Sequence, residues 1–189
     1  MTKKKADAVV LAAGLSSRLP EFKPLLKIGK ETLIEKVIKS LQNVCSKIIV
    51  VCGYRADEIM NLLNKYSKVQ VVINKNYSGG MFSSLQEGIK HVESGYFLII
   101  PGDMPFVKEK TYKALLEKED EIVIPVFKGK KGHPVFINSK FIPELLKEKM
   151  NSNLSKFIKK RNFGLLEVND KGILIDIDTK EDLKNIYSN

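Results

Sequence analysis

The sequence predicts a single α/β domain, a three-layer sandwich with a mainly parallel central sheet. Short apolar runs alternate with segments of helical periodicity from residue 8 to residue 125, which indicates successive strand–helix–strand units. The length of 189 residues suits one full hydrophobic core, and no linker, repeat or low-complexity segment divides it. We therefore expect one domain over residues 1–189.

Each element follows from its hydrophobic pattern. Continuous or alternating apolar runs bounded by turn residues predict strands over residues 8–12, 47–52, 69–73, 96–100, 121–125, 134–137, 165–168 and 172–177. Apolar residues three and four apart predict helices over residues 31–41, 56–63, 81–92, 108–116, 140–147 and 154–160, and a last helix starts at Thr179. The strand at 134–137 begins with proline, so we expect it to be antiparallel or at a sheet edge.

Composition excludes several classes of protein. No apolar run approaches the ~20 residues of a membrane span. The basic start at residues 1–7 leads directly into a strand and Gly14, so it is not typical of a signal peptide, and we expect a cytoplasmic protein with no membrane partner. Cys45 and Cys52 are the only cysteines and form no C-x-x-C pair, which indicates reduced, packed thiols.

The net charge of +10 first suggests nucleic-acid binding. The excess is nearly all lysine, however, and it is scattered along the chain rather than banded. No finger, recognition-helix or aromatic RNA-platform motif is present. A lysine-rich solvated surface explains the charge better, so we expect no nucleic-acid partner.

The first strand ends in a loop suited to an anion. The small residues Gly14 and Ser16 follow the apolar run, and Arg18 and Lys23 follow them. Open backbone N–H groups beside two cations favour the phosphates of a nucleotide. Either cation taken alone would be a surface charge, but the position of both beside Gly14 favours phosphate binding.

A short carboxylate follows the fourth strand. Asp103 stands between Gly102 and a Met-Pro pair, where it suits Mg²⁺, which prefers one or two carboxylates with phosphate oxygens and water. An Asp that caps its own turn is the alternative. Asp176 and Asp178 lie two apart on one face of an extended segment, so either could complete the metal site, or Asp178 could cap the following helix.

Two further positions have open alternatives. Ser83 and Ser84, just inside a helix start behind Gly80, could satisfy unpaired N–H groups or could hydrogen-bond a base or ribose. His133, between glycine and proline, is more typical of a loop residue than of a substrate contact.

The ordered motifs resemble a known family. Leu11-Ala12-Ala13-Gly14-x-Ser16-x-Arg18 with Lys23 is similar to the signature of nucleotidyltransferases with a Rossmann-like, nucleotide-diphospho-sugar transferase fold. The blocks at 80–85, 102–105, 132–134 and 176–183 follow in the order seen in molybdenum cofactor cytidylyltransferases of the MobA-like NTP transferase family. The similarity spans essentially the whole chain.

The resemblance implies transfer of CMP from CTP to the terminal phosphate of molybdopterin, with Mg²⁺ as cofactor and pyrophosphate as product. A molybdoenzyme that receives the product is a further implied partner. Loop residues Leu11 to Gly14 and Ser16, with Arg18 and Lys23, would hold the triphosphate. The block containing Gly80, Ser83 and Ser84 would face the nucleoside, Asp103 following Gly102 would bind the metal with Asp178, and His133 would lie on the pterin side.

Guanylyl-transferring relatives usually have glycine where this chain has Ala13, so Ala13 favours CTP. The family usually has glycine two residues after the arginine, but this chain has Leu19-Pro20 there. Pro20 lacks an N–H group and fixes φ, so that part of the loop donates fewer hydrogen bonds. Three alternatives stay open: transfer to a sugar or alditol phosphate, guanylyl transfer from GTP, and a non-catalytic maturation factor for molybdenum enzymes.

Overall fold

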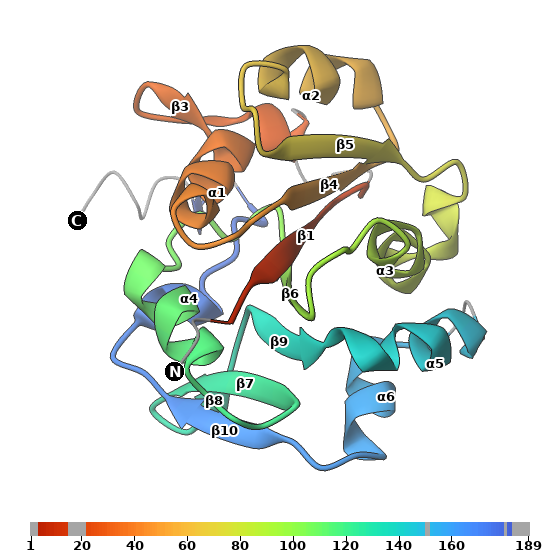
Figure 1. Ribbon diagram of the computed structural model, residues 1–189. Helices are drawn as coiled ribbons and strands as arrows, with labels where there is room; N and C mark the ends of the chain where they lie inside the picture. Colours follow the sequence, from red (N-terminus) through yellow and green to blue (C-terminus); the bar gives the residue numbers. More distant parts are fainter. Residues whose placement is uncertain (1–3, 15–21, 150–151, 180, 183–189) are drawn as a thin grey trace.

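One central sheet organises the computed structural model, which describes residues 4–14, 22–149, 152–179 and 181–182. Over these residues eight strands form the sheet, in the order β10-β7-β9-β6-β1-β4-β5 with β8 paired to β7 (Figure 1). The strands are β1 (Ala6–Ala12), β4 (Ile48–Cys52), β5 (Val69–Ile73), β6 (Tyr96–Pro101), β7 (Ile122–Phe127), β8 (Lys130–Lys131), β9 (Val135–Asn138) and β10 (Gly164–Glu167).

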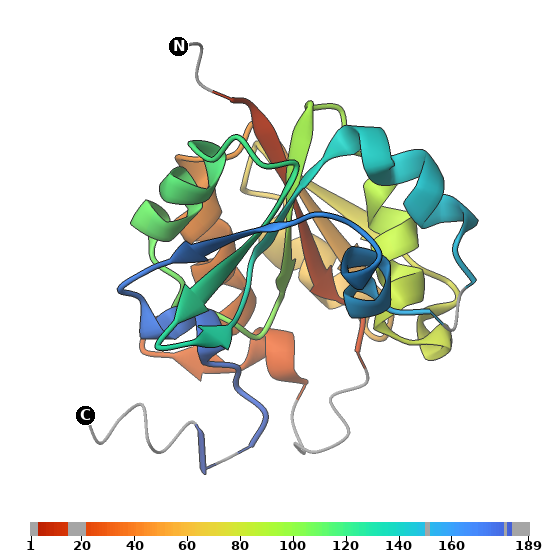
Figure 2. The same ribbon diagram turned by 90° about the horizontal axis from the view of Figure 1, so that it is seen from below.

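Helices cover both faces of this sheet, as the turned view shows (Figure 2). They are α1 (Leu33–Gln42), α2 (Ala56–Leu63), α3 (Met81–Ile89), α4 (Glu109–Leu116), α5 (Ile142–Lys147) and α6 (Leu154–Lys159). Short 3₁₀ turns occur at η1 (Lys23–Leu25), η2 (Tyr77–Gly79), η3 (Ser139–Phe141) and η4 (Lys171–Leu174), and a small hairpin pairs β2 (Lys27–Ile28) with β3 (Glu31–Thr32). None of the helices in the described ranges is long and apolar enough to cross a membrane.

Side chains of β1 alternate between two separate cores. Ala8 and Val10 pack with buried residues of α1, α2 and α4, whereas Val9 packs with α3 on the opposite face. This alternation follows from the two-residue period of a strand that is buried on both sides. The result is a helix–sheet–helix sandwich, which confirms the fold class that the sequence predicts.

Strand pairing is parallel between β1 and β4, β1 and β6, β4 and β5, and β7 and β10. β9 is antiparallel to both β6 and β7, so the prediction that the strand after Pro134 is antiparallel is confirmed. It lies inside the sheet rather than at an edge. Pro134 itself precedes the strand, so its missing N–H group interrupts no ladder bond.

The prediction of a strand over residues 172–177 is wrong. Residues 171–174 form η4, because the Asp170 carboxylate accepts a hydrogen bond from the Gly172 N–H at 3.0 Å and closes a turn there. The same carboxylate accepts from Lys108 N at 2.9 Å and from Thr111 Oγ1 at 2.6 Å, which ties this segment to the start of α4. Ile173 and Ile177 are buried as the apolar pattern requires, but they belong to hydrophobic clusters without forming a strand of the sheet.

The chain changes direction beside β1. From β1 it runs outward through β4 and β5, then crosses back so that β6 pairs with the other edge of β1. In open α/β sheets ligands bind outside the carboxyl ends of the strands at such a reversal. The ends of β1 and β6 therefore mark where a site is expected.

A capping box fixes the start of α1. The Glu35 carboxylate accepts from the Thr32 N–H at 2.9 Å, and Thr32 Oγ1 accepts from the Glu35 N–H at 3.3 Å. Lys65 and Tyr66 also donate to the buried Glu35 carboxylate, at 2.7 Å and 3.2 Å. Burial raises the pKa of Glu35, but these hydrogen bonds outweigh it and lower the pKa to about 2.

Substituting Glu35→Gln should reveal an acid-sensitive contribution to stability. Because the folded pKa lies below the unfolded value of 4.5, the contribution is complete above pH 4.5 and is lost as the pH falls towards 2. We expect the variant to be less stable than the wild type by about 2 kcal/mol at neutral pH, with the difference vanishing in acid. Denaturant unfolding followed by circular dichroism across this pH range measures it.

Glu58→Gln is the matched control, because Glu58 is an exposed partner of Arg55. Its removal should leave the stability close to that of the wild type, because solvent screens an exposed ion pair. A difference between Glu35→Gln and the wild type that does not vary with pH would contradict the assignment.

Candidate functional site

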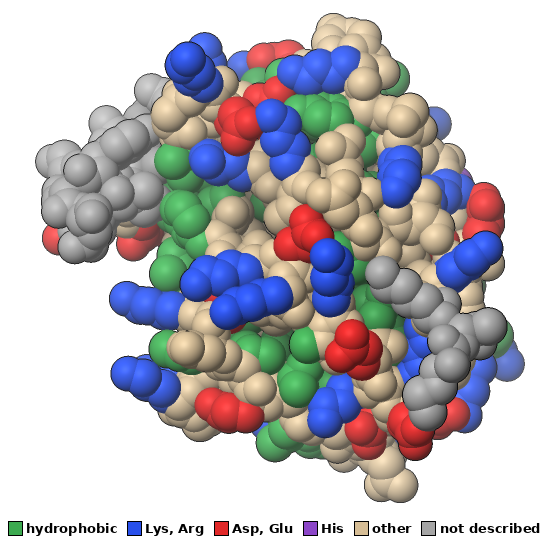
Figure 3. Space-filling view, turned by 60° about the vertical axis from the view of Figure 1, so that its left-hand side comes forward, with side chains coloured by type: hydrophobic (Ala, Val, Ile, Leu, Met, Phe, Trp, Pro, Cys, Tyr) green, Lys and Arg blue, Asp and Glu red, His purple; other side chains and the backbone are tan. Residues whose placement is uncertain are grey.

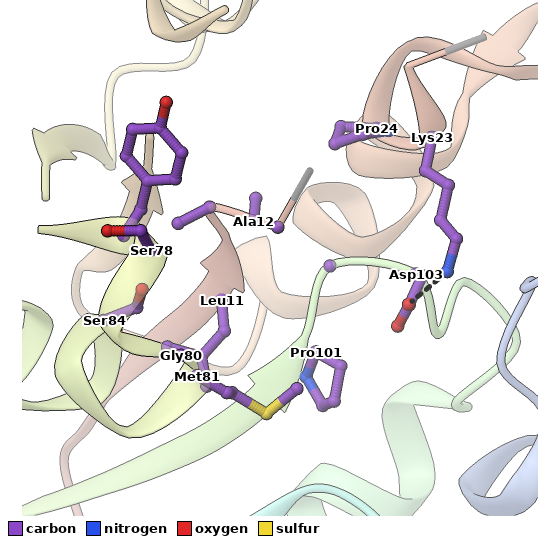
Figure 4. A pocket seen from close by; sticks show the side chains of 14 residues that line it. Leu11, Ala12, Lys23, Pro24, Ser78, Gly80, Met81, Ser84, Pro101 and Asp103 are labelled. Atoms are coloured by element: carbon purple, nitrogen blue, oxygen red, sulfur yellow. Dashed lines mark hydrogen bonds and ion pairs between the residues drawn. The ribbon is translucent and has the colours of Figure 1, made fainter. Parts of the chain in front are cut away.

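A pocket of about 380 Å³ opens at the carboxyl ends of β1 and β6 (Figure 4). Segments distant in sequence form its wall: Leu11 to Gly14, Lys23 and Pro24, Tyr77 and Ser78, Gly80 and Met81, Ser84, and Pro101 to Asp103. In Figure 4 Ser78 and Ser84 lie on one side of the pocket and Lys23 reaches towards Asp103 on the other. The pocket thus has one side that carries serine side chains and one side that carries charged side chains.

Three charged side chains meet at the charged side. Lys23 Nζ lies 3.2 Å from Asp103 Oδ2 and also donates a hydrogen bond to Asp178 Oδ1. Lys23 follows the first loop, Asp103 follows β6 and Asp178 follows η4, so three parts of the chain supply the cluster. The Lys23 side chain is 14% exposed, against 27% for Asp103 and 30% for Asp178.

Burial and the charges within the cluster shift the pKa values of Lys23 and Asp103. Burial lowers the pKa of Lys23, but hydrogen bonding and charge from Asp178 and Asp103 outweigh burial, so the net shift is upward. Burial raises the pKa of Asp103, and the attraction of Lys23 offsets only part of that shift. Lys23 is therefore a firmly protonated cation that partly buried carboxylates hold in place.

Backbone contacts hold Asp178 in this position. Ile177 N donates to the carbonyl of Asp103 at 3.1 Å, which joins the two aspartate segments directly. Asp178 N and Thr179 N both donate to Asp182 Oδ2, at 3.0 Å and 2.7 Å, and Asp182 N donates to Thr179 Oγ1 at 3.1 Å. This is the capping arrangement that the sequence predicts at Thr179.

Asp176 lies apart from the Lys23 contact. Its side chain is exposed, and it acts on Asp103 only as a nearby negative charge that raises the Asp103 pKa. Of the two alternatives that the sequence leaves open, Asp178 is the one that meets Asp103 on a shared cation.

The donor set fits a divalent metal ion. Asp103 and Asp178 already place one oxygen each around a single cationic atom, Lys23 Nζ. In the part of the chain that the structure describes, no group of three or more His, Cys, Asp or Glu side chains could hold a metal. Two carboxylates with open space beside them match Mg²⁺, which usually takes its other ligands from water and substrate phosphates.

A buried asparagine organises the side of the pocket that carries the serines. Asn74, 4% exposed and directly after β5, donates through Nδ2 to Ser83 Oγ and Ser84 Oγ, both at 3.0 Å. Its Oδ1 accepts from Asn76 N at 2.9 Å. Asn74 is not among the site residues that the sequence predicts, although a polar residue at the end of a strand is a signal for such a role.

The two serines differ in their access to the pocket. The Ser83 hydroxyl donates to Gly80 O at 2.8 Å and does not line the pocket wall, so its observed role is to hold the start of α3. Ser84 lines the pocket while its hydroxyl accepts from Asn74. Ser84 is therefore the better placed of the two to contact a ligand.

Two glycines shape the wall by different means. Gly80 has φ of +90° at the start of α3, in the region that favours glycine. Gly102 donates its N–H to Leu11 O at 2.9 Å, and a Cβ there would lie 3.2 Å from that oxygen and from the Ala12 side chain. Gly102 thereby lets the β6 loop close against the end of β1.

His133 lies beside a second cavity, of about 820 Å³, which shares Leu11, Gly80 and Met81 with the first pocket. Its backbone N donates to Ile173 O at 3.0 Å, and burial lowers the pKa of its ring. The imidazole is therefore neutral near pH 7 and lies in the wall of this second cavity.

Ser16 and Arg18, and the Leu19-Pro20 departure, lie outside the described residues. The charge pattern of the surface can be followed in Figure 3, where lysine and arginine side chains are spread among acidic ones and form no single band on the face shown.

Comparisons with known proteins identify a family and several relatives of this chain. A family model for the MobA-like NTP transferase domain matches residues 8–164. The chain is 26% identical over 177 residues to the molybdenum cofactor cytidylyltransferase of Escherichia coli (strain K12). The aligned region covers 93% of this chain and 92% of that protein. The chain is 27% identical over 189 residues to a probable molybdenum cofactor guanylyltransferase of Clostridium perfringens (strain ATCC 13124), with coverage of 97% and 91%.

Among solved structures, Rv0371c from Mycobacterium tuberculosis H37Rv has a TM-score of 0.84 at 22% identity and covers 98% of this chain and 99% of its own. A structure of Rv0371c in complex with manganese has a TM-score of 0.81 at 20% identity, with coverage of 97% and 98%. At these identities the likeness shows a common fold.

Substituting Asn74→Ala should loosen the start of α3. The change leaves the Asn76 N–H and two buried serine hydroxyls without the partner they share, so we expect a loss of about 2 kcal/mol in the free energy of unfolding. Denaturant titration measures it. Asn43→Ala is the control. Asn43 is exposed, and within the described residues its side chain hydrogen-bonds to Glu109 alone. Equal effects of the two substitutions would show that the Asn74 contacts do not hold the loop.

Proposed function

The chain belongs to the MobA-like NTP transferase family, as its motifs predict, and on that premise we propose that it transfers CMP from CTP to the terminal phosphate of molybdopterin and releases pyrophosphate. The observation that carries the proposal is the convergence of Asp103 and Asp178 on one cation, Lys23 Nζ, at the rim of the pocket. Paired carboxylates beside a nucleotide-sized pocket are what a metal-assisted attack on a triphosphate requires.

The residues present fit a divalent cofactor, for which we propose Mg²⁺ held by Asp103 and Asp178. When bound, the cation would neutralise the negative charge that builds up on the triphosphate during transfer. The manganese complex of Rv0371c, a protein of the same fold, is in keeping with a divalent ion.

The protein residues supply positioning and charge. Lys23 lines the pocket with its long flexible side chain, and with Arg18 it is our candidate to hold the triphosphate. Ala12 at the end of β1 and the following Ala13 and Gly14 line the pocket, and we assign their backbone N–H groups to phosphate oxygens. No general base is needed, because the attacking phosphate of the acceptor is already ionised, and a neutral His133 is consistent with that.

The preference for CTP rests on Ala13. Its methyl group lies in the pocket wall, 5% exposed, at the position where guanylyl-transferring relatives usually have glycine. The added methyl narrows the pocket, which favours a pyrimidine over the larger purine. The matches to a cytidylyltransferase and to a probable guanylyltransferase are of similar strength in identity, so they do not separate the two nucleotides.

The second cavity is our candidate for the acceptor. It adjoins the first pocket through Leu11, Gly80 and Met81, so a substrate there would face the triphosphate. Exposed lysines at its rim favour an acceptor that carries a phosphate: Lys131, Lys156 and Lys159. The floor of Ile99, Val135 and Phe163 suits a flat apolar ring system.

The proposal is tested by pyrophosphate release with purified protein, Mg²⁺, molybdopterin and each of CTP, GTP, UTP and ATP. We expect release with CTP that exceeds release with GTP by about tenfold or more, because the size of a base is discriminated by roughly that factor in a close-fitting pocket. Replacing molybdopterin by sugar or alditol phosphates tests the other acceptors. Preference for GTP would contradict the role of Ala13.

Asp103→Asn is the matched variant, since it keeps the size of the side chain and removes its charge. We expect pyrophosphate release to fall by about a hundredfold or more, while circular dichroism stays unchanged. Stoichiometric CTP binding by the wild type without pyrophosphate release under any acceptor would instead favour a non-catalytic maturation factor.

A further inference from the structure

We propose that Lys23 is the resident cation of the Asp103–Asp178 site and that it gives up this place to the divalent metal when a triphosphate arrives. The inference rests on the proposed function and adds an order of events to it. Metal binding would then be weak in the free protein and coupled to nucleotide binding.

The first step is geometric. The ammonium of Lys23 contacts Asp103 Oδ2 at 3.2 Å and Asp178 Oδ1 within hydrogen-bond reach, so it already occupies the point between the two carboxylates. Those oxygens are the donors that the metal needs. The two cations therefore compete for the same atoms, and they cannot both lie between them.

The second step concerns charge. The two carboxylates carry two negative charges, and Lys23 neutralises one of them. A divalent ion added while Lys23 stays in place would put two cations between the same two carboxylate oxygens, where they repel each other at close range in a partly buried site. Entry of the metal therefore requires the ammonium to move away from at least one carboxylate.

The third step is where the ammonium goes. Lys23 also lines the pocket that we assign to the nucleotide, so a short rotation of its four-carbon side chain takes Nζ from the carboxylates towards bound phosphate. The phosphate supplies the negative charge that Lys23 loses on leaving Asp178. Triphosphate and metal thus help each other to bind, which is a coupling between two sites through one side chain.

Direct titration with Mn²⁺ alone, followed by electron paramagnetic resonance without nucleotide, tests the competition. Lys23→Met keeps a long side chain and removes the charge, so the carboxylates are left to the metal. We expect Lys23→Met to bind Mn²⁺ about fivefold more tightly than the wild type or better, from the loss of two ion pairs with Lys23.

Lys30→Met is the matched control. Lys30 is an exposed lysine in the turn between β2 and β3, and its removal changes the net charge by the same amount. It should leave Mn²⁺ affinity within about twofold of the wild type. Asp178→Asn, which removes a donor, should weaken binding in the Lys23→Met background.

A second measurement guards against a folding defect. If Lys23→Met leaves two carboxylates unbalanced, saturating Mn²⁺ should raise its Tm by more than it raises the Tm of the wild type. Equal Mn²⁺ affinity and equal Tm shifts in the two proteins would overturn the exchange.

These outcomes are independent of the proposed function. A wild type that releases pyrophosphate while Lys23→Met gains no Mn²⁺ affinity would refute the exchange alone. A wild type that transfers no nucleotide while Lys23→Met binds Mn²⁺ more tightly would refute the proposed function and leave the exchange standing.

Discussion

The structure depends on one charged contact, the meeting of Asp103 and Asp178 on the ammonium of Lys23. β6 lies against β1 and ends in the Gly102 turn, which brings Asp103 to the edge of the sheet. The Ile177 N–H bond to the Asp103 carbonyl then draws Asp178 to the same point. Two carboxylates that meet at one point repel each other unless a cation lies between them, so the site suits a cation, either the lysine ammonium or a metal ion.

Much of the fold could be predicted from the sequence because its strands are buried on both faces. Continuous apolar runs such as 47–52 and 96–100 have no other stable place than the centre of a sandwich, and the helices between them share one apolar side. The short turn residues that follow these strands mark the ligand edge. Gly14, Gly80 and Asp103, which the sequence predicts as site residues, all line one pocket, and their roles are proposals.

The rest of the fold and of the site depends on side-chain hydrogen bonds, which the hydrophobic periodicity of the sequence does not reveal. The apolar run 172–177 is as hydrophobic as a strand, but Asp170 closes a turn at Gly172 and its backbone bonds go to loops. Asn74 is one polar residue after a strand, and only its contacts with Ser83 and Ser84 reveal its importance. The sequence predicts that Lys23 holds phosphate. It does not reveal the bond to both carboxylates, because Lys23 and Asp178 are 155 positions apart in the sequence.

The central claim is that one site serves Lys23 and the metal in turn, beside a bound nucleotide. A crystal structure with a non-hydrolysable CTP analogue and Mn²⁺, recorded at the manganese absorption edge, tests it most directly. If Lys23 gives way to the metal, an anomalous peak lies between Asp103 and Asp178, and Lys23 Nζ contacts a phosphate oxygen instead. Manganese bound elsewhere, or Lys23 still bridging both carboxylates with nucleotide present, would contradict it.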